Sequence, residues 1–209
     1  ALHDLELAAL VKHGDGTAYQ FRHALIRDVA YQSQTRAIRQ TTHLRIAEAL
    51  LASGGNFVDK HPEVIARHLA AGEDFARSVV YWLSAGNSAS QYAANHEAVQ
   101  FFRAGLQLID HLPAGLDRTH LEFALQNGLV LASIALGGYA SAEASDALAR
   151  VATLCEQHPG SPDMFRAVWG LWASASSRSG YHHAFDLAQQ LLRMAEQSGD
   201  AIHLQQAHF

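Results

Sequence analysis

The regular spacing of helix-breaking residues is the feature that most constrains this chain. All four prolines and most of the glycines fall between stretches in which apolar residues recur with the period of an α-helix. Proline lacks the amide donor that a helix interior needs, and glycine accepts the left-handed conformation that ends many helices. The intervals predict helices at 2–13, 23–34, 36–53, 62–72, 74–92, 95–112, 117–136, 140–158, 162–179 and 182–198, with another beginning near residue 201.

A single short segment follows a strand pattern instead. Residues 17–22 (TAYQFR) alternate between apolar and polar side chains directly after a Gly-Asp-Gly turn. Alanine is abundant in the rest of the chain, which favours helices and their close approach. The predicted fold class is therefore all-α, with one small β element near the N-terminus.

The helices carry a pattern of small and aromatic residues that is typical of tetratricopeptide repeats. One unit matches that repeat at Trp82, Gly86, Ala98, Phe102 and Gly105. The small residues would let two helices touch, while Trp82 and Phe102 fill the space between them. Two later units, at 138–149 and 180–191, keep less of the pattern. We expect a right-handed superhelix of antiparallel helix pairs from about residue 36; a plain helical bundle is the alternative.

Composition and charge exclude several classes of protein. Hydrophobic residues make up 49% of the 209 residues and the net charge is −5, so the chain has the apolar content of a folded core. The single cysteine, Cys155, excludes a disulfide framework and suits a reducing compartment. The apolar runs are too short to span a membrane, and no secretory signal precedes them. Because the chain begins without Met and ends within a helical pattern, we expect it to be a piece of a longer, cytoplasmic protein.

Four segments in order resemble one family of bacterial proteins. They read YQFRHALIRDVAY at 19–31, QTTHLRIAEALL at 40–51, PEVIARHLAAGE at 62–73 and VVYWLSAGNSA at 79–89. This order is similar to the region after the nucleotide-binding core of signal-transduction ATPases with numerous domains (the STAND class), which include adenylate/guanylate-cyclase-like ATPases and LuxR-type regulators. The resemblance implies the end of a winged-helix-like domain at 1–34 and tetratricopeptide-like repeats at 35–209, cut short at the C-terminus.

The same resemblance implies a regulatory role without catalysis in this segment. Such an arm would bind a protein or small inducer and control an upstream nucleotide switch. The family's ATP or ADP and Mg²⁺ would be held in the parent protein, because this chain has no phosphate-binding loop. We therefore expect no enzyme activity, no catalytic residues and no cofactor here. In relatives a winged-helix histidine in an F-x-H motif contacts the β-phosphate of ADP, and Phe21 and His23 match that motif.

Histidines and arginines are the remaining polar candidates. No two of the 14 histidines lie three or four residues apart, so no helical metal-binding pair is predicted. Between residues 19 and 46 the only acid is Asp28, beside five arginines: Arg22, Arg27, Arg36, Arg39 and Arg45. A DNA-associated segment of a LuxR-type regulator is the alternative function that they suggest. Residues 54–209, with nine basic and fifteen acidic residues, argue against nucleic acid as a partner.

A ligand or partner groove is predicted in the later repeats. Trp169 and Trp172 are three residues apart and share one helix face, and Arg166 lies one turn before Trp169. Exposed aromatic side chains on the inner helices of a superhelix serve as binding anchors, and Arg166 could pair with an acidic group of the ligand. The alternative is that both tryptophans are buried core residues.

Overall fold

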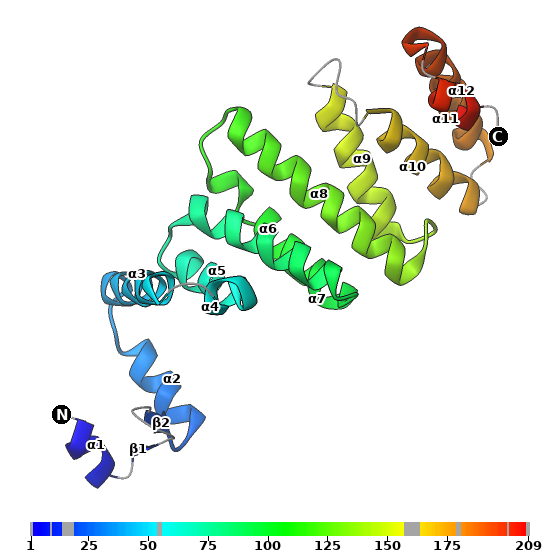
Figure 1. Cartoon of the computed structure of the whole chain (residues 1–209). Coiled ribbons are helices and arrows are strands. Elements are labelled where there is room, and N and C mark those ends of the chain that lie inside the picture. Colours follow the sequence, from blue (N-terminus) through cyan, green and yellow to red (C-terminus); the bar gives the residue numbers. More distant parts are fainter. Residues whose placement is uncertain are drawn as a thin grey trace.

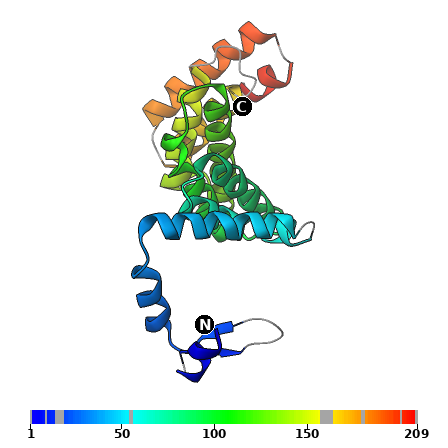
Figure 2. The same ribbon diagram turned by 90° about the vertical axis from the view of Figure 1, so that its left-hand side faces the viewer.

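The computed structural model describes residues 2–8, 10–13, 19–53, 56–156, 164–178, 181–199 and 201–207. Within them the chain is mainly helical and has one two-stranded sheet, which confirms the predicted all-α class. Figure 1 shows a small N-terminal unit standing apart from a stack of helices that contains the rest of the chain. In the side view of Figure 2, the helix α3 (Arg36–Ala52) lies across the base of the stack, between that unit and the other helices.

The N-terminal unit is a helix, a hairpin and a second helix: α1 (Leu2–Leu7), β1 (Val11–His13), β2 (Tyr19–Phe21) and α2 (Ala24–Gln32). The strands are antiparallel, with Val11 opposite Phe21 and His13 opposite Tyr19. The predicted helix at 2–13 is therefore wrong after residue 7, because residues 11–13 satisfy their backbone groups by pairing with β2. The predicted strand is confirmed at Tyr19–Phe21; the turn before it lies outside the described residues.

The stack continues from α3 with helices separated by short turns. They are α4 (Asn56–Lys60), α5 (Pro62–Ala71), α6 (Phe75–Gln91), α7 (Asn95–Leu106), the 3₁₀ helix η1 (Ile109–His111), α8 (Leu116–Gly137), α9 (Ala142–Glu156), α10 (Met164–Ser177), α11 (Tyr181–Ser198) and α12 (Ala201–Ala207). Two details differ from prediction: α4 is an additional helix, and the predicted helix at 95–112 is divided into α7 and η1. Within the described residues, no helix has the length and apolar character needed to cross a membrane.

Consecutive helices of the stack pack on one another. From α5 to α12 each helix contacts the next one in the sequence, and α5 also packs on α3. In addition α6 contacts α8, although α7 lies between them in the sequence. Sequence neighbours therefore remain neighbours in space, so the fold is built mainly from local helix contacts.

Two of the turns have the same backbone geometry although neither contains glycine at the critical position. Glu73, between α5 and α6, has φ 63°, and Ala93, between α6 and α7, has φ 57°. In each turn the next residue donates its N–H across the helix end, from Asp74 to the carbonyl of Leu69 and from Ala94 to that of Ala89, both at 2.9 Å. This is the Schellman arrangement, in which glycine is the usual left-handed residue.

The main core lies where α6, α7 and α8 meet, around Phe102. This side chain is fully buried. A Cβ placed on Gly86 of α6 would lie 2.4 Å from the Phe102 ring, and one on Gly128 of α8 would lie 2.3 Å from it. Missing side chains on both neighbouring helices therefore make room for this ring. The predicted contact at Gly86 is confirmed, but its direct partner is Phe102, whereas Trp82 packs beside Gly105.

Candidate functional site

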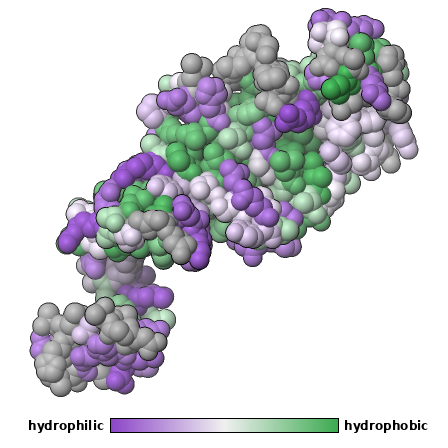
Figure 3. Space-filling view, in the orientation of Figure 1, coloured by the Kyte–Doolittle hydropathy of each residue, from purple (hydrophilic) through white to green (hydrophobic). Residues whose placement is uncertain are grey.

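A cavity of about 880 Å³ between α6 and the start of α8 is a candidate for a binding site. We call it the α6–α8 groove. Its walls are largely apolar, and they include Val80 and Leu121 together with the loop Leu112, Pro113, Ala114 and Gly115. Val80 is 49% exposed, so a large apolar side chain faces solvent at this position. Figure 3 shows apolar surface in this middle part of the helical stack.

Local chain chemistry positions the α6 side of the groove. Asp74 caps α6 by accepting the backbone N–H of Arg77 at 3.2 Å. The buried face of α6 carries Val79 and Trp82, which turns Ala76 and Val80 toward the opposite face. The burial pattern of one helix therefore fixes which of its residues line the groove.

The cationic side chains around the groove already have partners. Arg77 Nε bonds Asp74 Oδ2 at 2.7 Å, and Arg77 Nη1 lies 2.7 Å from Glu48 Oε1 of α3. These partners raise the pKa of Arg77, the Asp74 hydrogen bond most of all. On the α8 side, Arg118 pairs with Asp110 at 2.5 Å. Two arginines therefore border the groove without offering an uncompensated positive charge.

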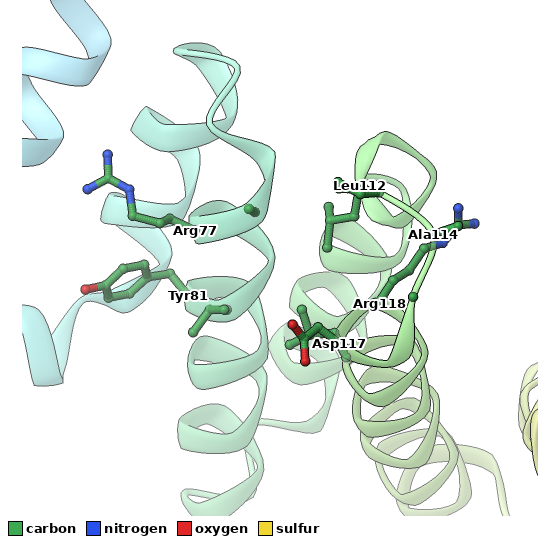
Figure 4. Close-up of a pocket in the computed structure, with 11 residues that line it drawn as sticks. Arg77, Tyr81, Leu112, Ala114, Asp117 and Arg118 are labelled. Atoms are coloured by element: carbon green, nitrogen blue, oxygen red, sulfur yellow. The ribbon is translucent and has the colours of Figure 1, made fainter. Parts of the chain in front are cut away.

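Asp117 is the charged group that faces the groove itself. Figure 4 shows its carboxylate between α6 and α8, whereas Arg77 and Tyr81 extend from the far side of α6 and the guanidinium of Arg118 points outward. The structure gives Asp117 no ion pair within the described residues. An apolar wall with one carboxylate suits a ligand that combines an apolar group with an amine, a lysine or an arginine.

The predicted groove residues of the later repeats lie on α10. Trp169 and Trp172 are half-buried, with ring centroids 6.0 Å apart. Both pack against the core cluster of Phe165, Val168, Leu187, Leu191 and Ala195. Arg166 is exposed on the same helix. The tryptophans thus contribute to the core and keep part of their surface accessible, and their role as binding anchors stays a prediction.

His23 begins α2 without capping it. Its side chain is exposed and makes no capping hydrogen bond, while its backbone carbonyl accepts from Ile26 at 3.1 Å. Three of the five N-terminal arginines are already engaged within the chain. Arg27 pairs with Asp28, Arg36 pairs with Glu73, and the guanidinium of Arg39 lies 5.3 Å from the ring centre of Tyr31.

One polar cluster was missed by the sequence analysis. His43 and His68 are 25 residues apart, and packing of α3 on α5 brings their Nδ1 atoms within 2.8 Å of each other. Local spacing cannot reveal such a pair, since it depends on which helix faces meet. Within the described residues no group of three histidine, cysteine or acidic side chains could hold a metal ion.

Comparison with known proteins gives one similarity in sequence. The chain is 25% identical over 183 residues to the protein R02095 of Rhizobium meliloti (strain 1021), which is described as uncharacterized. The match covers 86% of this chain but 18% of that relative. No family model and no solved structure matches the chain.

Proposed function

We propose that this chain is a non-catalytic binding arm of a larger signalling ATPase, built from tetratricopeptide-like helix pairs. The α6–α8 groove carries this proposal, because it combines an apolar wall with one inward-facing carboxylate, Asp117. The tetratricopeptide-like character is supported by the burial of Trp82 and Phe102 and by glycine contacts at Gly86 and Gly105. A chain that aligns with 18% of a longer relative also suits a role as one part of a multidomain protein.

The arm would bind an effector, either a protein segment or a small inducer, and thereby control the nucleotide switch of its cytoplasmic parent. In the parent, His23 would meet the phosphate of bound ADP, and an exposed imidazole can donate an N–H to such an oxygen. The nucleotide and its Mg²⁺ would be held by another domain. The α10 surface of Arg166, Trp169 and Trp172 would be a second contact for the effector.

A selection experiment tests the groove as a binding site. Peptides selected for binding to the chain are expected to combine apolar residues with lysine or arginine. Asp117→Lys reverses the charge of the carboxylate that faces the groove and should weaken binding of the selected peptide at least about tenfold, or about 1.4 kcal/mol. Asp186→Lys makes the same charge change on the exposed face of α11 and serves as the matched control. Equal affinity of both variants would refute this use of the groove.

A further inference from the structure

Three ionisable side chains from three different helices form a continuous hydrogen-bonded chain. Tyr31 Oη of α2 lies 2.9 Å from His43 Nε2 of α3. The other ring nitrogen of His43, Nδ1, lies 2.8 Å from Nδ1 of His68 on α5. Both imidazole nitrogens of His43 are therefore used, one toward the N-terminal unit and one toward the helical stack.

These three hydrogen-bonded side chains lie where the N-terminal unit joins the stack. None of the residues of α2 is buried. Figure 2 shows the unit of α1, β1, β2 and α2 projecting away from the N-terminal end of α3 and from the helical stack. Within the described residues, two side-chain contacts join α2 to α3: the hydrogen bond between Tyr31 and His43, and Arg39 placed over the Tyr31 ring. The direction in which the unit projects thus depends on very few contacts.

The number of protons on the two imidazole rings decides whether the His43–His68 hydrogen bond can form. Two Nδ1 atoms at 2.8 Å share one proton, so one nitrogen must donate and the other must accept. His43 can carry a charge and still donate from both nitrogens, provided that His68 is neutral and Tyr31 accepts. When both imidazoles are protonated, neither Nδ1 can accept, and two positive charges face each other.

Of the neighbouring charged groups, Arg39 of α3 lies over the Tyr31 ring and adds a positive charge beside the two histidines, and other nearby arginines are paired with carboxylates. On the adjacent turns Arg36 of α3 pairs with Glu73 of the α5–α6 turn, and Arg77 of α6 pairs with both Glu48 and Asp74. From α2, the group that faces His43 is the Tyr31 hydroxyl. Burial lowers the pKa of His68, and the charge of His43 lowers it further. No carboxylate is in contact with either ring to stabilise the doubly charged pair within the described residues.

We propose that the Tyr31–His43–His68 chain is a pH-sensitive latch that holds the N-terminal unit in one direction while His68 is neutral. Protonation of both histidines breaks the Nδ1–Nδ1 bond and pushes the rings apart. His43 then loses its support on α5, and the bond from His43 to Tyr31 loses its fixed position. The N-terminal unit is released to reorient on α3, while the helical stack remains folded.

Distance measurements on the 209-residue chain test the latch. Spin labels are attached to cysteines introduced at the exposed positions Lys12 and Asn87, in a chain in which the native cysteine is replaced by Cys155→Ala. A single narrow distance distribution is expected at about pH 7.5. A broad one is expected at about pH 4.5, well below the ordinary imidazole range, because the pKa of His68 is lowered and a lower pH is needed to charge it. A distribution that is unchanged between the two pH values would overturn the proposal.

Three variants locate the effect. His68→Gln supplies a side chain that can accept from His43 at either pH, so its distribution should stay narrow. Tyr31→Phe keeps the aromatic ring under Arg39 but removes the hydroxyl, so its distribution should be broad already at about pH 7.5. His96→Gln removes an exposed histidine of α7 and should respond like the unmodified chain. A His68→Gln variant that broadens at low pH as the unmodified chain does would refute the latch.

Discussion

The ring of Phe102 lies so close to the backbone of Gly128 that a Cβ at residue 128 would be 2.3 Å from the ring Cζ. Real Cβ atoms do not approach another atom this closely. Gly86 stands against the same ring from the neighbouring helix, at 2.4 Å. Phe102 of α7 is thus held between two glycine backbones, which explains how three helices approach around one aromatic side chain.

Gly128→Ala should therefore destabilise the chain, although alanine is the better helix former. The gain in helix propensity is about 1 kcal/mol, whereas overpacking costs about 1–3 kcal/mol, and the buried ring has no space to retreat. Chemical denaturation of the unmodified chain and of Gly128→Ala measures the difference in their free energies of unfolding. Because Phe102→Leu frees space at the same contact, the Gly128→Ala/Phe102→Leu double variant should show a smaller loss than the two single losses added together. Simple additivity would show that the contact is absent.

Ala93→Gly is expected to stabilise the chain. Ala93 is exposed and has φ 57°, a left-handed conformation that costs an L-residue about 1 kcal/mol relative to glycine. Thermal unfolding should show a higher melting temperature. Ala89→Gly, one turn earlier within α6, is the comparison variant and should lower it, since glycine inside a helix costs about 1 kcal/mol and the Ala89 methyl group also packs against the core. A loss of stability in both variants would contradict the turn geometry.

The ion pair between Glu122 and Arg150 should contribute more to stability than an ion pair on the surface, because the Glu122 carboxylate is buried. Glu122 is 7% exposed, and Arg150 approaches its Oε1 through Nε at 2.6 Å and Nη2 at 2.5 Å. Arg150→Met would leave this carboxylate without its partner. We expect a loss of about 1–3 kcal/mol, because the guanidinium is partly exposed to solvent.

Two comparisons check the interpretation of that ion pair. Adding Glu122→Gln to Arg150→Met removes the stranded charge and should restore part of the lost stability. Arg103→Met breaks the more exposed pair with Glu143 and should cost less than about 1 kcal/mol. If Arg103→Met costs as much as Arg150→Met, burial of Glu122 is not the cause.

Stability should fall as the pH drops below about 6.5, and His68 should account for part of the fall. Burial lowers the pKa of His68 from its ordinary value of 6.5. Below that pH the unfolded chain therefore binds a proton that the folded chain resists, which favours unfolding. Denaturation at about pH 7.5 and about pH 5.5 should show a smaller decline for His68→Gln than for the unmodified chain. An equal decline in both would exclude His68 as a contributor.

The helices could be predicted from the sequence because residues at their ends mark where they begin and end. In α5, for example, Pro62 marks the start and Gly72 marks the end. The strand β1 could not, because residues 11–13 continue an apolar helical pattern and become a strand only by pairing with β2. The left-handed conformation of Ala93 could not be predicted from the sequence either, since alanine is not a residue typical of turns.

Of the candidate site residues, some could likewise be predicted from local spacing and others could not. Helical spacing placed Trp169 and Trp172 on one face, and their ring separation of 6.0 Å confirms that they are neighbours. The α6–α8 groove and the His43–His68 pair depend on contacts between helices that are distant in the sequence. No local pattern contains that information. Residues on the exposed faces of several helices become a site only after the stack has formed.

Photo-cross-linking with a bound ligand tests the central claim most directly. A photoreactive phenylalanine analogue is placed at Val80 in the α6–α8 groove, at Trp172 on α10, or at Leu131, which is 70% exposed on α8 outside the groove. A selected peptide should form an adduct at Val80 that disappears in the Asp117→Lys background, and none at Leu131. Adduct formation at Trp172 or Leu131 without any at Val80 would contradict the assignment of the α6–α8 groove as the binding site.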